Sequence, residues 1–396
     1  MTEYRFGIEE EFFVVNSTTL ETVQHLPATF VKSCKNKLGE RVSTELLQSQ
    51  LELVSPILSS ASSARDCILE QRSTAMRMAA SHGFALIASG THPASNWANQ
   101  VTTASPRYQV VSDELKMLTR RNLLCGLHVH VEVPDPSRRV ELMTRLQPYL
   151  PLFVALSSSS PFWRGHSTGL LSYRPVAYSE LPRTGLPPVF QSAQEYDDLI
   201  ELLTSSGAIP DASYIWWAIR PASRFPTLEL RASDACTWAA DSLALASLFR
   251  CLVRRLFVDK TAGIPMSRAG TPIVAENMWR ACRESTKCTI IDASRRAAVP
   301  LTDWLDELIQ WLGDDAAALG VGADLETLRA IPAQGTSAHH QRVIYEHALQ
   351  RGKSSFGATR EVVHWLKGAT SGELRQLPRS ATGSKSDTRR FAPVPT

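Results

Sequence analysis

The stretch Phe6–Phe13 sets three carboxylates, Glu9, Glu10 and Glu11, between apolar and aromatic residues. Its aromatic and β-branched surroundings, Tyr4–Val15, predict a strand, in which successive side chains point to opposite faces. Glu9 and Glu11 then share one face, while Glu10 lies on a mostly apolar face that packs on helices. Two carboxylates this close repel each other unless a cation lies between them, and hard divalent cations take carboxylate oxygens. For this stretch alone, a solvated acidic patch on an edge strand is the alternative.

Further polar residues stand in apolar strands later in the chain. Glu52 lies in the segment Glu40–Pro56, which reads as extended, and an exposed edge position is the alternative for it. The strictly alternating strand Leu123–Pro134 places His128 and His130 on its polar face. Such a histidine pair could bind a metal or phosphate, and a zinc hydrolase could use it.

A fourth strand, Phe225–Asp234, places Glu229 and Arg231 on one face. They could form a self-satisfied ion pair, or a metal ligand beside a phosphate clamp. An antiparallel sheet with one face on helices and one face open would gather all these polar residues in one concave site. The full set is Glu9, Glu11, Glu52, His128, His130, Glu229 and Arg231. Such a set suits two or three Mg²⁺ or Mn²⁺ ions and the polyphosphate of ATP, which predicts phosphoryl transfer.

Composition narrows the class of protein. The chain has 396 residues with 43% hydrophobic content, enough for one large domain or two intimately joined ones. A net charge of +3 gives no argument for nucleic acid, and no apolar run is long enough for a membrane span. The start of the chain shows no signal segment, so a cytoplasmic enzyme is expected. Seven cysteines without a C-x-x-C pair argue against disulfides and a thiolate zinc site, and no P-loop or Rossmann motif occurs.

The remaining chain reads as mostly helical. Residues 16–38 look polar and irregular, and the long loop 157–190 is rich in proline, glycine and serine. Its arginines, Arg164, Arg174 and Arg183, could clamp phosphate or carboxylate, with surface salt bridges as the alternative. The tail from 371 is expected to be disordered. Helices are predicted near 60–82, 107–121, 137–156, 193–206, 238–258, 272–285, 301–313, 323–331, 337–350 and 357–368. Pro148 and Pro151 are expected to interrupt the helix at 137–156.

An ordered set of short motifs resembles one enzyme family. The motifs are Phe6–Phe12 (FGIEEEF), Gln50–Pro56 (QLELVSP), Gly90–Pro93 (GTHP), Arg107–Tyr108, Cys125–Val131 (CGLHVHV), Ser159–Gly165 (SSPFWRG), Arg183–Pro188 (RTGLPP), Arg220–Pro221 and Thr227–Asp234 (TLELRASD). In this order they resemble the type 2 glutamate–cysteine ligases, or carboxylate–amine ligases, which are related in fold to glutamine synthetase. Weaker similarity continues through 276–280 and 335–342.

The resemblance implies an α+β, glutamine-synthetase-like fold: a mainly antiparallel sheet with helices on one face and an open concave active-site face. It also implies one catalytic domain over 1–370, followed by the tail 371–396. The implied cofactors are ATP and Mg²⁺ or Mn²⁺. ATP would phosphorylate a carboxylate, expected to be the glutamate γ-carboxylate, and an amine such as cysteine would attack the acyl phosphate. Relatives of this kind suggest a homodimer with small-molecule acid and amine substrates, and no nucleic-acid or membrane partner.

The resemblance also implies residue roles, carried over position by position. The implied metal ligands are Glu9, Glu11, Glu52, His128 and Glu229. The implied nucleotide and substrate contacts are His128, His130, Arg231, Arg164, Arg174 and Arg183. The implied catalytic residues are Arg231, Glu52 and Glu229. Arg231 would stabilise charge on the transferred γ-phosphate.

Two positions depart from the family pattern. Ala218 and His166 stand where relatives often carry an acidic residue, which puts cysteine in doubt as the acceptor amine. Two other functions remain as alternatives to the ligase. One is a metal-dependent hydrolase that uses His128 and His130 and needs no ATP, and the other is a non-catalytic binding protein of the same fold.

Overall fold

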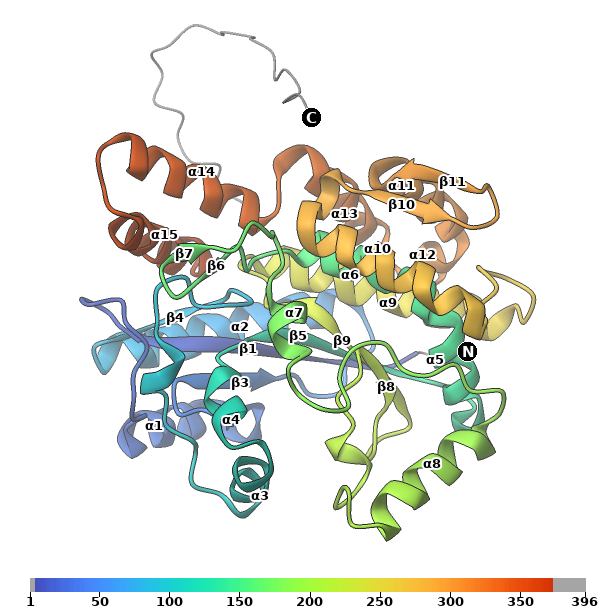
Figure 1. The fold of residues 1–396 in the computed structure, drawn as a ribbon, viewed down its shortest axis with the longest axis horizontal. Helices are drawn as coiled ribbons and strands as arrows, with labels where there is room; N and C mark the ends of the chain where they lie inside the picture. The colour runs from blue at the N-terminus through green and yellow to red at the C-terminus, as the bar shows by residue number, and fades with distance from the viewer. Residues whose placement is uncertain (1–3, 373–396) are drawn as a thin grey trace, which may run out of the picture.

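A seven-stranded antiparallel sheet forms the centre of the molecule in the computed structural model, which describes residues 4–372 (Figure 1). The strand order is β2-β3-β1-β5-β9-β8, and β4 pairs with one end of β1. The strands are β1 (Phe6–Asn16), β2 (Val42–Thr44), β3 (Gln50–Val54), β4 (Phe84–Ile87), β5 (Gly126–Glu132), β8 (Ile219–Pro221) and β9 (Thr227–Asp234). The four polar-faced strands expected from the sequence are therefore neighbours in one sheet.

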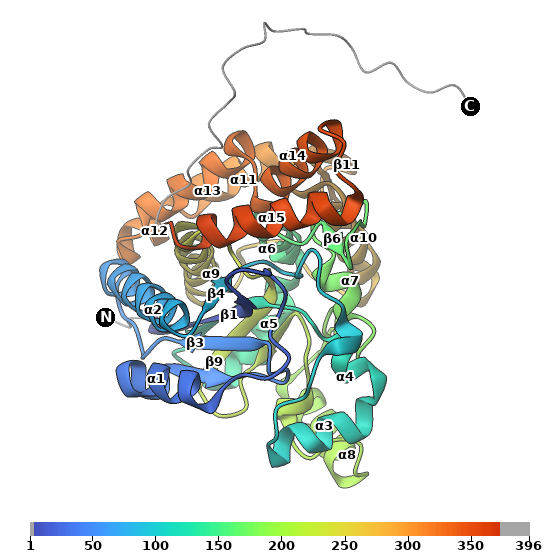
Figure 2. The same ribbon diagram turned by 90° about the vertical axis from the view of Figure 1, so that its left-hand side faces the viewer.

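Helices cover the apolar face of this sheet, as the alternation of residues predicts. Ile8, Val129 and Leu230 are fully buried in the main hydrophobic core. The helices that pack there include α2 and α9, which lie on the same side of the sheet in both views (Figures 1 and 2). Glu10 also points into this side, where the guanidinium of Arg72 from α2 bonds both of its carboxylate oxygens, at 2.7 and 2.9 Å. The buried carboxylate is thereby paired, as burial of a charge requires.

The helix predicted at 60–82 is confirmed as α2, and its ends have local causes. The Ser60 hydroxyl accepts a hydrogen bond from the Ser63 amide, which caps the first turn. Gly83 follows the last turn with φ of 77°, a conformation that glycine adopts without strain. The helices from the N-terminus to the middle of the chain are α1 (Ala28–Leu38), α2 (Ala61–Ser81), α3 (Pro106–Leu115), α4 (Met117–Arg121), α5 (Arg139–Leu146), α6 (Leu150–Ser157), α7 (Arg174–Tyr178) and α8 (Ala193–Ser205).

The chain after β9 is mainly helical, as predicted, and α10 to α15 lie above the sheet in Figure 1. One small hairpin, β10 (Thr289–Asp292) with β11 (Ala297–Pro300), was not predicted. Both strands are only four residues long, too short for a clear alternation. The helices are α9 (Ala239–Val258), α10 (Thr271–Glu284), α11 (Leu301–Trp311), α12 (Gly313–Leu319), α13 (Gly322–Gln334), α14 (Ser337–Gln350) and α15 (Ser355–Thr370).

Several sequence predictions were wrong in detail. The segment expected to be irregular at 16–38 contains α1, which buries Phe30, Cys34 and Leu38 on one side of an otherwise largely polar helix. The single helix expected at 107–121 breaks at Lys116, where φ is 53°. By contrast, the interruption expected at Pro148 within the helix 137–156 is confirmed, because a short 3-10 turn, Gln147–Tyr149, separates α5 from α6. The extended segment 40–56 is two strands that pair with each other.

The loop 157–190 contains short elements of its own. A hairpin of β6 (Phe162–Trp163) and β7 (His166–Ser167) is followed by α7. Residues 373–396, which hold nearly all of the predicted disordered tail, lie outside the described residues. Within residues 4–372, no helix combines the length and apolarity needed to cross a membrane.

Candidate active site

Acidic and imidazole side chains stand directly opposite one another on neighbouring strands. The opposed pairs are Glu11 and Glu52, Glu9 and His128, and His130 and Glu229. Opposite residues of antiparallel strands have Cβ atoms about 5 Å apart. The antiparallel register therefore collects side chains from four distant parts of the sequence into one row across β3, β1, β5 and β9.

This row forms the floor of the main pocket of the protein, a cavity of about 400 Å³. Its walls come from α3 and α7, and from residues 213–225 before β9. Tyr108, Val111 and Leu115 line one wall, while Arg224 and Phe225 line the opposite end beside His130. A pocket of this size accommodates small molecules, and charged groups converge at its floor.

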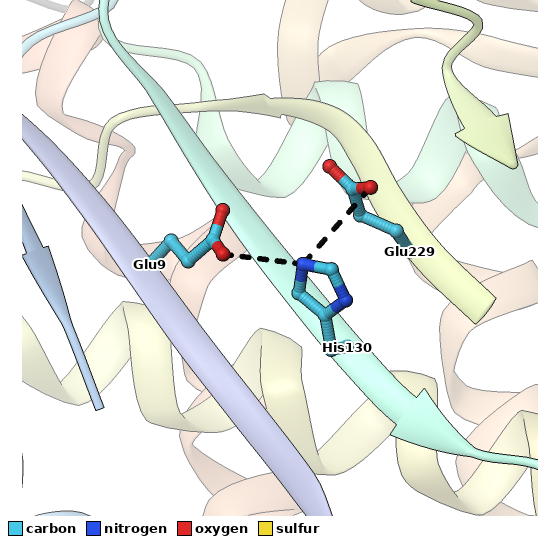
Figure 3. A group of neighbouring side chains, drawn as sticks. All are labelled: Glu9, His130 and Glu229. Atoms are coloured by element: carbon cyan, nitrogen blue, oxygen red, sulfur yellow. Dashed lines mark ion pairs between the residues drawn. The ribbon is translucent and has the colours of Figure 1, made fainter. Parts of the chain in front are cut away.

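Three groups of side chains in this pocket have the spacing of cation ligands. The first joins Glu9, His130 and Glu229, from three adjacent strands (Figure 3). The His130 Nε2 atom lies 3.3 Å from Glu9 Oε1 and 4.0 Å from Glu229 Oε2. All three side chains point toward a common centre.

The other two groups continue along the row. One consists of Glu9, Glu52 and His128, and the other of Glu11, Glu45 and Glu52. In each group the ligand atoms lie within 4.8 Å of one another. Because Glu9 and Glu52 each belong to two groups, the three positions form a connected chain. Among residues 4–372, no group of this kind contains two histidines or a cysteine.

The side chains fit divalent cations that prefer oxygen ligands. Nε2 of His128 is buried and has no hydrogen-bond partner, with the Glu11 carboxylate 3.8 Å away, while the buried Nε2 of His130 has only the 3.3 Å contact with Glu9. A buried imidazole nitrogen without a partner is costly unless it accepts a ligand. Five carboxylates with at most one histidine in each group suit Mg²⁺ or Mn²⁺ better than zinc, which favours nitrogen and sulfur.

At the Glu45–Glu52 end of the row, burial and neighbouring carboxylates raise the pKa values of both glutamates. Burial, followed by the nearby Glu11 carboxylate, raises the pKa of Glu45 to about 8. Burial and the Glu45 charge likewise raise the pKa of Glu52 well above its usual range. At Glu9 burial opposes ionisation, but hydrogen bonds with His128 and His130 hold its pKa well below the ordinary value. The raised pKa values show that the negative charge of Glu45 and Glu52 is poorly compensated by neighbouring side chains, and a cation would supply that compensation.

Two arginines border the other end of the row. Glu229 pairs with Arg231, two positions along the same strand, and with Arg220 of β8, whose Nε lies 2.7 Å from Glu229 Oε2. Burial opposes its ionisation, but these guanidinium groups lower the pKa of Glu229 far below its usual range. Arg231 also approaches the hydroxyl of Tyr178 at 3.4 Å. A carboxylate ligand thus stands between a cation position and two fixed positive charges.

The three arginines expected from the loop 157–190 lie in different places. Arg174 lines the main pocket. Arg164 lines a separate surface pocket at the β6–β7 hairpin. Arg183 lines neither: it pairs with Glu114 at 2.7 Å and donates to the Tyr214 carbonyl.

Sequence reasoning missed two members of the site. Glu45 lies between β2 and β3, where the chain leaves the strand, so the alternation of faces gave no signal for it. Arg220 belongs to a short strand of three residues, and only its pairing opposite Glu229 brings it to the row.

The two positions that depart from the family pattern do not lie at the floor of the pocket. His166 is exposed and lines the surface pocket at the β6–β7 hairpin. Ala218 packs against the main core, and its carbonyl accepts a hydrogen bond from the Arg231 amide at 2.8 Å.

The fold of this chain resembles those of solved ligase structures. A bifunctional glutathione synthetase from Pasteurella multocida superposes with a TM-score of 0.69 at 14% identity, covering 92% of this chain and 52% of that one. A glutamate–cysteine ligase from Francisella tularensis, solved in complex with AMP, gives 0.63 at 12% identity and covers 92% of both chains. These likenesses confirm the predicted α+β, glutamine-synthetase-like fold.

Comparison with other sequences is more specific. A protein of Bradyrhizobium diazoefficiens named "Putative glutamate--cysteine ligase 2" is 42% identical over 343 residues, which are 87% of this chain and 80% of that one. A protein of the same name from Rhodospirillum rubrum is 37% identical over 375 residues, covering 94% and 96%. The profile described as "Glutamate-cysteine ligase family 2" matches residues 5–364. The chain therefore belongs to family 2 of the glutamate–cysteine ligases.

Proposed function

We propose that this protein is an ATP-dependent carboxylate–amine ligase. An oxygen of the acid substrate, the γ-carboxylate of glutamate in the simplest case, attacks the γ-phosphorus of ATP, and ADP leaves. An amine then attacks the carbonyl carbon of the acyl phosphate. The new C–N bond replaces the C–O bond to phosphate, and phosphate and a proton are released.

One observation carries this proposal: a single pocket floor combines three overlapping cation positions with two arginines at one end. Phosphoryl transfer needs little covalent help from a protein, because its catalysis consists of positioning the reactants and neutralising charge. Cations held by this row would supply that neutralisation when bound. The family and its named relatives support the same chemistry.

The residues then take distinct roles. The cation ligands are Glu9, Glu11, Glu45, Glu52, His128, His130 and Glu229. Arg231 stabilises negative charge on the transferred phosphoryl group, and Arg220 holds Glu229 in place through a paired ion contact. Because the metal-binding groups contain at most one histidine each, the row favours this ligase over a zinc hydrolase built on His128 and His130.

The test is ADP formation by the purified protein with ATP and Mg²⁺, across a matrix of acids and amines. We expect ADP release that requires both an acid and an amine, with glutamate among the acids and the best amine named by the matrix. ADP release with an acid but no amine would indicate that the acyl phosphate forms and is then hydrolysed by water. Absence of ADP release across the matrix would contradict the proposal, as would turnover that does not depend on a divalent cation.

A further inference from the structure

The two strands that carry His128 and Arg231 are joined irregularly. Leu127 pairs with Ser233 and Val129 pairs with Leu230, so one residue of β5 stands opposite two residues of β9. This is a β-bulge, a feature that commonly re-aims a side chain beside an active site. The two residues in the bulge are Arg231 and Ala232.

A guanidinium group closes this bulge. Arg174 of α7 is buried, and its Nη1 atom donates to the carbonyl oxygens of Arg231, at 3.2 Å, and Ser233, at 3.0 Å. Its own backbone amide bonds Ser160, whose hydroxyl in turn bonds the buried Asp234. One side chain thus ties down both carbonyls around the irregular stretch of β9.

The missing side chain of Gly126 makes room for this guanidinium. A Cβ atom on Gly126 would lie 2.2 Å from Arg174 Nη2 and 2.7 Å from its Cζ, distances that no real contact allows. A larger residue at the start of β5 would therefore displace Arg174 from the bulge.

The same short helix also contacts the far end of Arg231. Tyr178, one turn after Arg174, places its hydroxyl 3.4 Å from Arg231 Nη2. The Arg174 guanidinium lies over the Tyr178 ring, 5.5 Å from its centre. Residues of α7 therefore hold Arg231 at both its carbonyl and its guanidinium.

We propose that Arg174 is a positioning residue, which closes the β5–β9 bulge and so aims Arg231 at the phosphate that the pocket receives. This assigns Arg174 to the protein backbone rather than to a substrate carboxylate. The inference rests on the proposed function, in which Arg231 contacts the γ-phosphate of ATP.

Nucleotide binding tests the role without turnover. The probes are ADP and AMP-PNP, with Mg²⁺, in titration calorimetry on the full chain. The readout is the ratio of the two dissociation constants, which reports contacts to the γ-phosphate. We expect Arg174→Gln to keep its affinity for ADP and to weaken AMP-PNP binding relative to ADP binding about tenfold. A change of this size corresponds to the loss of one charge-assisted hydrogen bond. Retained ADP affinity shows in the same experiment that the pocket is still formed.

A double-variant cycle separates positioning from direct contact. Because Arg174 acts through Arg231, Arg174→Gln should have no further effect on the ratio in an Arg231→Gln background. Gly126→Ala leaves both arginines in the sequence, and in the wild-type background it should reduce the preference for AMP-PNP as Arg174→Gln does. In the Arg174→Gln background, Gly126→Ala should leave the ratio of the two dissociation constants unchanged. Arg174→Lys should fall between, since a single ammonium cannot span the two carbonyls as a planar fork does.

Arg145 provides the matched control. Its guanidinium also bonds backbone carbonyls, those of Leu256, Asp259 and Ala262, but outside the pocket, so Arg145→Gln should leave the nucleotide ratio unchanged. Equal losses from Arg174→Gln in both backgrounds would overturn the inference, as would an unchanged ratio. A wild-type protein that binds neither nucleotide would instead overturn the proposed function, and this inference with it.

Discussion

Glu52 contributes a carboxylate to two of the three candidate cation groups, so its loss should affect more of the site than the loss of Glu229, which belongs to one. The Ser43 hydroxyl donates to Glu52 at 2.8 Å, and glutamine can keep that contact through its carbonyl oxygen. Glu52→Gln should therefore remove charge and a metal ligand while preserving the fold. We expect ADP formation to fall at least about 100-fold.

Glu132 offers the control for this substitution. It lies on the same sheet, in β5, but pairs with Arg5 away from the pocket. Glu132→Gln should retain near wild-type turnover. Unchanged turnover and Mg²⁺ dependence in Glu52→Gln would remove Glu52 from the ligand set.

His92 is expected to make the stability of the folded protein depend on pH in the acid range. It is fully buried, its Nδ1 accepts hydrogen bonds from the Ala94 and Ser95 amides, and burial lowers its pKa to about 3. Below pH 6.5 the unfolded chain can protonate this ring, whereas the folded chain cannot until about pH 3. The wild type should therefore lose stability relative to His92→Gln as the pH falls, by about 2 kcal/mol between pH 7 and 5.

Urea unfolding of both proteins at several pH values measures this difference. Other titrating groups are common to the two proteins and cancel in the comparison. A stability gap that stays constant from pH 7 to 5 would mean that His92 is not held neutral by the fold.

At the scale of elements, the ion pair between Glu10 and Arg72 joins β1 to α2 beneath the active site. Both side chains are about 95% buried. Arg72→Ala would leave the Glu10 carboxylate buried without its partner, and it would remove bonds to the Cys236 and Thr237 carbonyls. We expect a loss of about 3–5 kcal/mol in the free energy of unfolding, measured by denaturant titration.

The comparison is the solvent-accessible ion pair between Glu70, which also lies on α2, and Arg41, which precedes β2. Arg41→Ala should cost at most about 1 kcal/mol, because solvent screens this pair. Similar costs for the two substitutions would show that the buried pair does not pin β1 to α2.

Much of the site could be predicted because it depends on the two-residue period of strands. Glu9, Glu11, His128, His130 and Glu229 were placed on one face by alternation alone, and the register then brought them together. The features that strand alternation does not determine were not predicted, and each has a physical reason. Glu45 lies off the strand, and the bulge at Arg231 depends on a guanidinium more than fifty residues away in the sequence. The break between α3 and α4 at Lys116 likewise depends on a positive backbone φ angle, which the amino-acid composition of the segment does not predict.

At the scale of the whole molecule, cation binding should stabilise the fold. The row joins β3, β1, β5 and β9, so ions bound there would link strands from distant parts of the chain. Saturating Mg²⁺ should raise the free energy of unfolding by about 2–3 kcal/mol at a hundredfold excess over its dissociation constant. Thermal unfolding with Mg²⁺ and with a chelator measures this. Glu52→Gln should show a smaller shift, and an identical shift in both proteins would place the cation elsewhere.

In the proposed reaction, ATP activates the acid as an acyl phosphate. The most direct measurement uses the acid substrate labelled with ¹⁸O in its reacting carboxylate, together with ATP, Mg²⁺ and the amine that gives the fastest ADP release. If the carboxylate attacks the γ-phosphorus and the amine later displaces phosphate, one labelled oxygen moves into inorganic phosphate in each turnover. Inorganic phosphate free of ¹⁸O, or label recovered in AMP, would contradict the claim.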